Sequence, residues 1–346
     1  MESNFIISQE NIWLNIDKPE GYSSAKIVAM VKKFTGAKKV GHAGTLDPFA
    51  SGILPIALNK ATKTARFIES SDKKYFFRIK WGEMTDTDDI EGKVIDFNDK
   101  RPRNIDIINV MSYFIGDILQ SPSRFSAIKI NGERAYNLAR SGIEFEIKKR
   151  PIKIFDLKLL QNNEKFADFE VSCSKGTYIR SLARDMCLKM GVCGHLEKLI
   201  RTKVGKFSYS SRISLDKLKI ISNYKNYIVN RSIISLFEIL DFAEIAEVDD
   251  LNRFKFKNGQ MIAIDVLKNT NLSPKNSEIV RVVHNRELIG IAKIIDIKDI
   301  DQNNLPTSFV CGKVNQELTK YFSSQLLSEE KISNFNIKFL EPINVF

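Results

Sequence analysis

One short loop of the sequence brings together residue types that could do chemistry. Residues 41–55 contain three glycines, two prolines, one of the three histidines and a single acid, Asp47. Glycine permits unusual backbone dihedrals and proline fixes them, so we expect a rigid loop in which Gly44 and Pro48 support the acid. A lone carboxylate flanked by apolar residues on such a loop could serve as one reactive acid. Aspartate before proline also starts turns, and this is the alternative for Asp47 taken alone.

Four other segments, together with this loop, resemble the motifs of one known family. They are residues 14–24, 74–88, 122–136 and 173–180, and with the loop they follow the family's order over residues 11–206. The loop sequence Gly-His-Ala-Gly-Thr-Leu-Asp-Pro resembles the catalytic motif of the TruB-type tRNA pseudouridine synthases. The resemblance implies an enzyme that isomerises uridine to pseudouridine at position 55, in the T loop of tRNA.

The resemblance also implies roles for particular residues. Asp47 would carry the cleavage and re-formation of the glycosidic bond, Arg180 would form an ion pair with it, and Tyr75 would stack on the flipped base. The other implied residues are the substrate contacts His42, Tyr178 and Leu199, and Lys18 as a support of the loop. Taken alone, Arg180 could simply pack its stem and meet solvent, and an aromatic on an alternating strand such as Tyr75 is usually core.

The implied reaction sets what the chain needs besides these residues. Pseudouridine formation breaks the bond between ribose C1′ and uracil N1 and rejoins the base through C5. No electrons leave and no group is lost, so we expect neither a cofactor nor a metal. The step is related to glycoside cleavage, in which a carboxylate stabilises or traps positive charge at the sugar carbon. Three roles stay open for Asp47: attack on the sugar, attack on the base, or removal of a ribose proton.

The charge of the chain favours a polyanionic partner. Lys and Arg number 53 against 42 Asp and Glu, which gives a net charge of +11. Such a surplus suits nucleic acid first and an anionic membrane surface second. Basic clusters that could contact phosphates are residues 32–33, 38–39 and 148–150, and Lys198, Arg201, Lys203 and Lys206. With the resemblance, this charge predicts tRNA as the partner, bound through its T arm, and no membrane.

The cysteines and the first residues indicate a cytoplasmic chain. No Cys-x-x-Cys pair occurs, and Cys187, Cys193 and His195 fit no common zinc spacing, so we expect free thiols in a reducing cytosol. The N-terminus lacks a basic region followed by an apolar core, and no apolar run reaches the length of a membrane span. The acidic run at residues 86–92 lacks the calcium-loop pattern. We also expect a monomer.

The elements that must position the site predict an α+β fold. Apolar residues alternate from Tyr75 to Trp81 and predict a strand, while Ser23 and Gly36 mark the two ends of a helix. A second helix is expected to begin near Thr177. Hairpins with segregated helices predict a mixed, largely antiparallel sheet with flanking helices. The resemblance implies that this is the pseudouridine synthase fold.

Changes of composition along the chain predict three parts. Residues 1–231 are the expected catalytic domain, in which the polar stretch 208–231 is a linker or an insertion. Residues 232–300 are expected to form a small PUA-like β domain that binds RNA, by their position relative to the family. Residues 301–346 are a C-terminal extension of unknown role, and their Phe, Leu and Ile content indicates packing.

Two other functions fit part of these observations. An RNA-binding or tRNA-folding protein, with catalysis secondary, would use the basic charge, but it would not need an acid such as Asp47 close to RNA phosphates. A pseudouridine synthase that acts on another RNA would keep the chemistry and change the target. The absence of an obvious lysine-rich tail argues against that third reading.

Overall fold

The chain falls into two compact units, Met1–Ser235 and Leu236–Phe346. The computed structural model describes residues 6–126, 128–130, 132–223, 231–264, 279–296 and 338–346. Most of the expected C-terminal extension, and Cys311 within it, lies outside these residues. Within the part described, no helix has the length and apolar character needed to cross a membrane.

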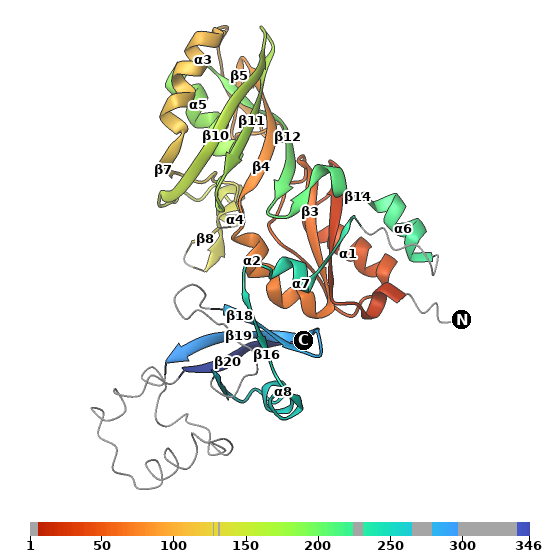
Figure 1. Ribbon diagram of the computed structural model, residues 1–346. Helices are drawn as coiled ribbons and strands as arrows, with labels where there is room; N and C mark the ends of the chain where they lie inside the picture. Colours follow the sequence, from red (N-terminus) through yellow and green to blue (C-terminus); the bar gives the residue numbers. More distant parts are fainter. Residues whose placement is uncertain (1–5, 127, 131, 224–230, 265–278, 297–337) are drawn as a thin grey trace, which may run out of the picture. The chain divides into compact units, whose positions relative to one another are not determined.

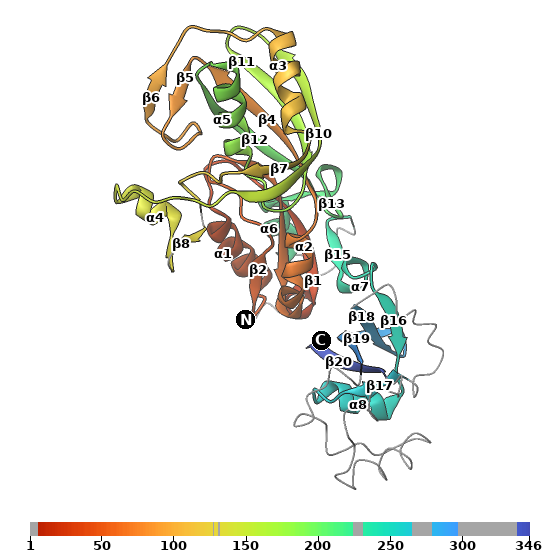
Figure 2. The same ribbon diagram turned by 90° about the vertical axis from the view of Figure 1, so that its left-hand side faces the viewer.

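The first unit is built on an eleven-stranded mixed sheet (Figures 1 and 2). Its main path runs β14-β1-β3-β12-β4-β11-β10-β7, with β2, β13 and β15 paired at its sides. In chain order these strands are β1 (Ile12–Lys18), β2 (Val40–His42), β3 (Ser51–Leu58), β4 (Lys73–Trp81), β7 (Gly116–Gln120), β10 (Arg150–Asn162), β11 (Phe166–Cys173), β12 (Gly194–Val204), β13 (Phe207–Ser208), β14 (Ile213–Ser214) and β15 (Ile233–Ser235). Two of the pairings, β1 with β14 and β3 with β12, are parallel and the others are antiparallel. The expected α+β class and largely antiparallel sheet are confirmed.

Helices cover the two halves of this sheet separately. Near β4, β10 and β11 lie α3 (Asn104–Met111) and α5 (Ile179–Met190), whose residues share one hydrophobic core with those strands. Near β1 and β3, α1 (Ser24–Thr35) and α6 (Leu215–Asn223) form a second core (Figure 1). The strand β12 lies between β3 and β4 and therefore joins the two halves.

Local sequence signals explain two of these elements. The Ser23 side chain accepts a hydrogen bond from the Lys26 N–H and caps the start of α1, and Gly36, with a φ of 67°, ends it in the left-handed region. Along β4 the side chains from Tyr75 to Trp81 alternate between the core and the opposite face. Both elements agree with the sequence-based prediction.

Shorter elements complete the first unit. The strands β5 (Glu83–Thr85) and β6 (Val94–Phe97) pair with each other, as do β8 (Lys129–Ile130) and β9 (Glu133–Arg134). The short helices are α2 (Ala65–Glu69) and α4 (Ala135–Arg140), with 3-10 turns at Ile6–Gln9, Asn59–Thr64, Ser112–Phe114 and Tyr209–Ser211. The polar stretch expected as a linker or insertion contains β14 and α6, and its residues 224–230 lie outside the description.

The second unit contains its own five-stranded sheet, in the order β16-β18-β19-β20-β17. Its elements are α7 (Leu236–Ile239), β16 (Glu244–Glu247), α8 (Asp250–Lys257), β17 (Ile262–Ala263), β18 (Ile279–His284), β19 (Glu287–Asp296) and β20 (Lys338–Val345). A separate hydrophobic core, which includes Val280, Val282 and Phe256, lies under this sheet. The unit is a C-terminal β domain, and the last residues of the chain contribute β20 to it.

Candidate active site

The loop that carries Asp47 connects β2 to β3 and is supported by Lys18. The Lys18 ammonium donates hydrogen bonds to the carbonyl oxygens of Pro48 and Ala50 inside the loop. This side chain is fully buried, and burial lowers the pKa of its amine to about 8. One ammonium thus ties the part of the loop that follows Asp47 to β1.

Packing and turn chemistry hold the rest of the loop. The Ser24 hydroxyl accepts a hydrogen bond from the Leu46 N–H at 2.9 Å and donates to the Leu46 carbonyl at 3.0 Å. Leu46 and Phe49 are buried in the core beneath β4, so the residues around Asp47 are anchored in the other half of the sheet. Gly44 has a φ of 82°, which a residue with a side chain rarely adopts. The loop is held on both sides of Asp47.

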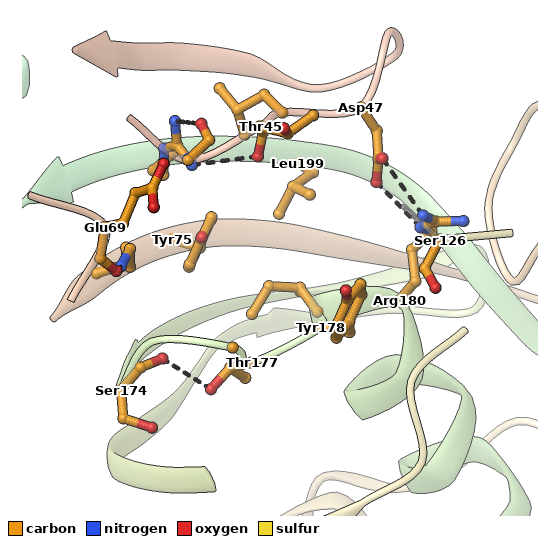
Figure 3. Close-up of a pocket in the computed structure, with 16 residues that line it drawn as sticks. Thr45, Asp47, Glu69, Tyr75, Ser126, Ser174, Thr177, Tyr178, Arg180 and Leu199 are labelled. Atoms are coloured by element: carbon orange, nitrogen blue, oxygen red, sulfur yellow. Dashed lines mark hydrogen bonds and ion pairs between the residues drawn. The ribbon is translucent and has the colours of Figure 1, made fainter. Parts of the chain in front are cut away.

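The structure brings Arg180 directly to Asp47. Arg180 Nε lies 3.0 Å from Asp47 Oδ2, and Nη2 lies 3.3 Å from Oδ1. The Arg180 side chain is only 5% exposed, whereas that of Asp47 is 34% exposed. Figure 3 shows the two dashed lines between these side chains at one end of the cavity described below. The forked guanidinium therefore orients a carboxylate that still reaches open space.

The start of α5 determines where Arg180 points. The Gln120 side chain, at the end of β7, accepts from the Tyr178 N–H at 2.8 Å and donates to the Tyr178 carbonyl at 3.0 Å. The Thr177 hydroxyl donates to the Ser174 carbonyl and closes the preceding turn. These contacts set the first turn of the helix, in which Arg180 is the second residue.

Asp89 forms a second carboxylate contact to Arg180, which the sequence analysis did not identify. Arg180 Nη1 lies 3.3 Å from Asp89 Oδ2, and the Asp89 side chain is 4% exposed. Burial raises the pKa of Asp89, and hydrogen bonding to Thr87 and the nearby Arg180 act against that shift. Arg180 also donates to the carbonyl oxygens of Thr87 and Phe125. The guanidinium is therefore held on several sides before it meets Asp47.

A cavity of about 310 Å³ opens beside the ion pair. Six of the predicted site residues line it, namely Gly44, Asp47, Tyr75, Tyr178, Arg180 and Leu199. Figure 3 shows Tyr75 and Leu199 between the Asp47 end and the Glu69 end, with Tyr178 nearby. Burial raises the pKa of Tyr75 to about 12, so its hydroxyl stays protonated at neutral pH. An aromatic ring, an aliphatic side chain and a paired carboxylate around this space can hold one flat ring beside a carboxylate.

Three predicted residues do not line this cavity. Lys18 and Pro48 act behind the loop, as described above, and Pro48 contributes its carbonyl oxygen to Lys18. His42 lies on β2, is half-buried, and has a buried Nδ1 with no hydrogen-bond partner in the structure. Burial lowers the pKa of His42, followed by the effect of the nearby Arg201 cation. The predicted contact of His42 with RNA stays a prediction.

Arg201 differs from the sequence-based prediction. It was grouped with surface lysines that could contact phosphates, yet it is only 1% exposed and it lines the cavity. On β12 its main chain lies beside Gly52 in the parallel pairing with β3. A basic residue next to other basic residues carries no signal of burial, so the sequence alone could not show whether Arg201 is buried or lies on the surface.

The described residues contain no group of three or more His, Cys, Asp or Glu side chains suited to a metal ion. Cys173, Cys187 and Cys193 are buried free thiols. Burial raises the pKa of Cys173 to about 12 and also raises the pKa of Cys187. The chemistry considered below is that of the Asp47 carboxylate, the Arg180 guanidinium and the Tyr75 phenol, which all line the cavity.

Two family models match the chain in succession. Residues 32–179 match the N-terminal domain of the TruB family pseudouridylate synthases, and residues 180–245 match the C-terminal domain of tRNA pseudouridylate synthase B. The tRNA pseudouridine synthase B of Ehrlichia ruminantium is 44% identical over 263 residues, which cover 74% of this chain and 87% of that protein. The tRNA pseudouridine synthase B of a Caulobacter species (strain K31) is 40% identical over 253 residues, covering 73% and 81%.

Solved structures of low sequence identity share the fold. An H/ACA ribonucleoprotein chain, bound to a substrate RNA containing 2′-deoxyuridine, has a TM-score of 0.63 at 21% identity and covers 97% of this chain and 84% of that chain. A chain of a Cbf5-Nop10-Gar1 complex has a TM-score of 0.63 at 24% identity and covers 85% and 80%.

Proposed function

The chain belongs to the TruB family and is a tRNA pseudouridine synthase, and we propose that it acts on uridine 55 of the T loop with Asp47 as the reacting acid. The observation that carries this proposal is the ion pair between Asp47 and Arg180 at a cavity lined by Tyr75. A base stacked in a folded RNA must be flipped out before an enzyme can reach its glycosidic bond. The cavity offers such a base a ring to stack on and an acid beside it.

In the proposed reaction the flipped uracil lies against the Tyr75 ring. Asp47 drives cleavage of the bond between C1′ and N1, by attack on the sugar, attack on the base or removal of a ribose proton. The base then turns and C5 bonds to C1′, and the proton lost from C5 is balanced by the one that N1 gains. Arg180 holds the carboxylate through two nitrogen atoms, and this fixed orientation lowers the entropic cost of reaching the reactive geometry.

The remaining site residues have proposed roles in holding the RNA. Tyr178 and Leu199 line the cavity and would contact the flipped nucleotide, and His42, on the strand that leads into the loop, would contact the RNA around it. Lys18, Gly44 and Pro48 would keep the loop in place. No cofactor is needed for an isomerisation of this kind.

The proposed partner is the T arm of tRNA, in the cytoplasm. The net charge of +11 supports phosphate binding through counterion release. Asp47, Tyr75 and Arg180 all belong to one unit of a single chain, which supports action as a monomer. The second unit includes most of the region expected to be PUA-like, and its proposed role is to add RNA contacts.

The test is an Asp47→Asn variant, assayed for pseudouridine on a tRNA transcript and on an isolated T-arm hairpin. We expect no product with either RNA, because the amide keeps the shape of the side chain and loses its charge. The affinity for tRNA should stay within about threefold of wild type. The control is Asp17→Asn, because Asp17 pairs with Arg212 and does not line the cavity. Wild-type turnover by Asp47→Asn would refute the role of Asp47. Pseudouridine formed by the wild-type enzyme in a tRNA that carries cytidine at position 55 would refute the target.

A further inference from the structure

The site contains a second buried arginine whose hydrogen bonds converge on the Asp47 loop. Arg201 Nε donates to the Ile53 carbonyl at 2.8 Å, and Nη2 donates to the Gly44 carbonyl at 2.9 Å. Nη1 lies 3.4 Å from the Thr45 carbonyl. Gly44 and Thr45 precede Asp47, and Ile53 follows it. One guanidinium therefore bridges the two arms of the loop, a different part from that held by Lys18.

Arg201 also contacts the aromatic residue of the site. The nearby Arg201 cation acts against the burial that raises the pKa of the Tyr75 phenol. On the main chain the two residues lie opposite each other in the antiparallel pairing of β12 with β4. Arg201 thus bonds to the loop of one half of the sheet through its side chain and pairs with Tyr75 of the other half through its main chain.

The electrostatics of Arg201 are unusual for a residue that serves packing alone. It is 1% exposed, and no carboxylate is within 4.0 Å of its guanidinium among the ion pairs of the described residues. Burial of a guanidinium without a paired carboxylate is costly, and backbone carbonyls satisfy its N–H groups only in part. Burial lowers the pKa of the Arg201 guanidinium, and Tyr75 and Asp47, which both line the cavity, act against that shift.

We propose that Arg201 is a positioning residue, which sets the geometry of Asp47 relative to Tyr75 by holding both arms of the loop with one guanidinium while its main chain pairs with that of Tyr75. The inference rests on the proposed function, since it assigns a role within that same site. The close approach of the strands agrees with it: a Cβ on Gly52 would lie 2.4 Å from the Arg201 carbonyl oxygen, so glycine is required where the loop meets β12. Arg201 need not touch RNA to act in this way.

The first test separates the chemical step from RNA binding. Arg201→Lys keeps the charge but cannot bond to both arms of the loop. We expect the single-turnover rate at saturating enzyme to fall by about 10- to 150-fold, the effect of one lost charge-assisted hydrogen bond. The dissociation constant for tRNA should stay within about threefold, since no phosphate contact is lost. A rate within threefold of wild type in a folded variant would overturn the proposal, and so would a loss confined to affinity.

The matched control is Arg281→Lys in the second unit. Arg281 is also a buried arginine, 8% exposed, and donates to the carbonyl oxygens of Ala243 and Phe237, but it lies outside the cavity. The control should keep the wild-type single-turnover rate. If it loses as much rate as Arg201→Lys, the effect is the general cost of altering a buried arginine and the proposal fails.

A double-mutant cycle of Arg201→Lys with Tyr75→Phe measures the coupling between the two substitutions in the single-turnover rate. A merely structural role of Arg201 would give no such coupling. Tyr75→Phe removes the hydroxyl of the residue that pairs with Arg201 across β12 and β4, so the two changes together should lower the rate by less than the product of their separate effects. Strictly multiplicative effects of Arg201→Lys and Tyr75→Phe would overturn a shared role of the two residues. Wild-type protein without any pseudouridine activity would instead refute the proposed function, and the two failures are therefore distinguishable.

Discussion

Replacing Arg180 with lysine tests the ion pair on which the proposed reaction depends. Arg180 uses Nε and Nη2 to hold the two carboxylate oxygens of Asp47, at 3.0 and 3.3 Å, while Nη1 faces Asp89 at 3.3 Å. A lysine keeps the positive charge, but its compact ammonium cannot reproduce a planar fork between two carboxylates. The substitution therefore removes geometry and leaves the charge.

The magnitude follows from the exposure of the pair. The Asp47 side chain is 34% exposed, so the 3–5 kcal/mol typical of breaking a fully buried pair is too large an estimate here. The loss of one charge-assisted hydrogen bond is worth about 1.5–3 kcal/mol. Since about 1.4 kcal/mol changes a rate tenfold, the chemical step should slow by about 10- to 150-fold. The affinity for tRNA should change little, because Arg180 is buried.

The assay is the single-turnover rate of pseudouridine formation at saturating enzyme, on a tRNA transcript. Arg184→Lys is the matched control, because Arg184 lies one turn further along α5 and pairs with Asp88 and Asp185, away from the cavity. The control should retain the wild-type rate. The reasoning is wrong if Arg180→Lys reacts as fast as wild type, or if Arg184→Lys slows to the same degree.

Two further predictions concern the supports of the loop. Raising the pH through about 8 should slow the single-turnover rate, because the buried Lys18 ammonium, with a pKa of about 8, then loses a proton and holds the loop carbonyls less well. The Lys18→Met variant should be slow and should lack this fall of the rate at alkaline pH. A fall that survives in the variant would belong to another group. The unfolded chain keeps this proton up to about pH 10.5, so through Lys18 the free energy of unfolding should increase between pH 8 and 10.5. Gly52→Ala should lower the free energy of unfolding in urea by at least about 2 kcal/mol, since the residue has a φ of +97° and its Cβ would meet a backbone oxygen at 2.4 Å. Gly191→Ala, with a φ of +67° and no atom within 4 Å of the added Cβ, should cost only the backbone term, and equal losses would show that the clash is relieved.

Local signals in the sequence predicted the elements that position the site. Alternation from Tyr75 to Trp81 identified β4, and Ser23 with Gly36 marked the ends of α1, because caps and pleats depend on neighbours along the chain. The pseudouridine synthase fold followed from the order of five motifs. A strong resemblance of this kind supplies the topology, which periodicity alone does not contain.

Long-range contacts within the site could not be predicted from residue types. Asp89 meets Arg180 across 91 positions of the chain, and the Arg201 side chain reaches Gly44 across 157. Burial of a charged side chain depends on strand register, and register is set by the whole sheet. This is why Asp89 was considered only as part of an acidic run and Arg201 as one of several surface cations.

The pairing of β12 with β3 is short, and the geometry of the site depends on it. The register between β12 and β3 pairs only Ile200 with Ser51 and Arg201 with Gly52, whereas the pairing of β12 with β4 continues along most of the strand. Asp47 lies on the β3 side of this seam between β12 and β3, and Tyr75 and Arg180 lie on the β4 side. A small opening along this seam would draw Leu46 and Phe49 out of the core beneath β4 and separate the acid from its cation. On heating, turnover should then be lost at a lower temperature than the cooperative unfolding of either half of the sheet.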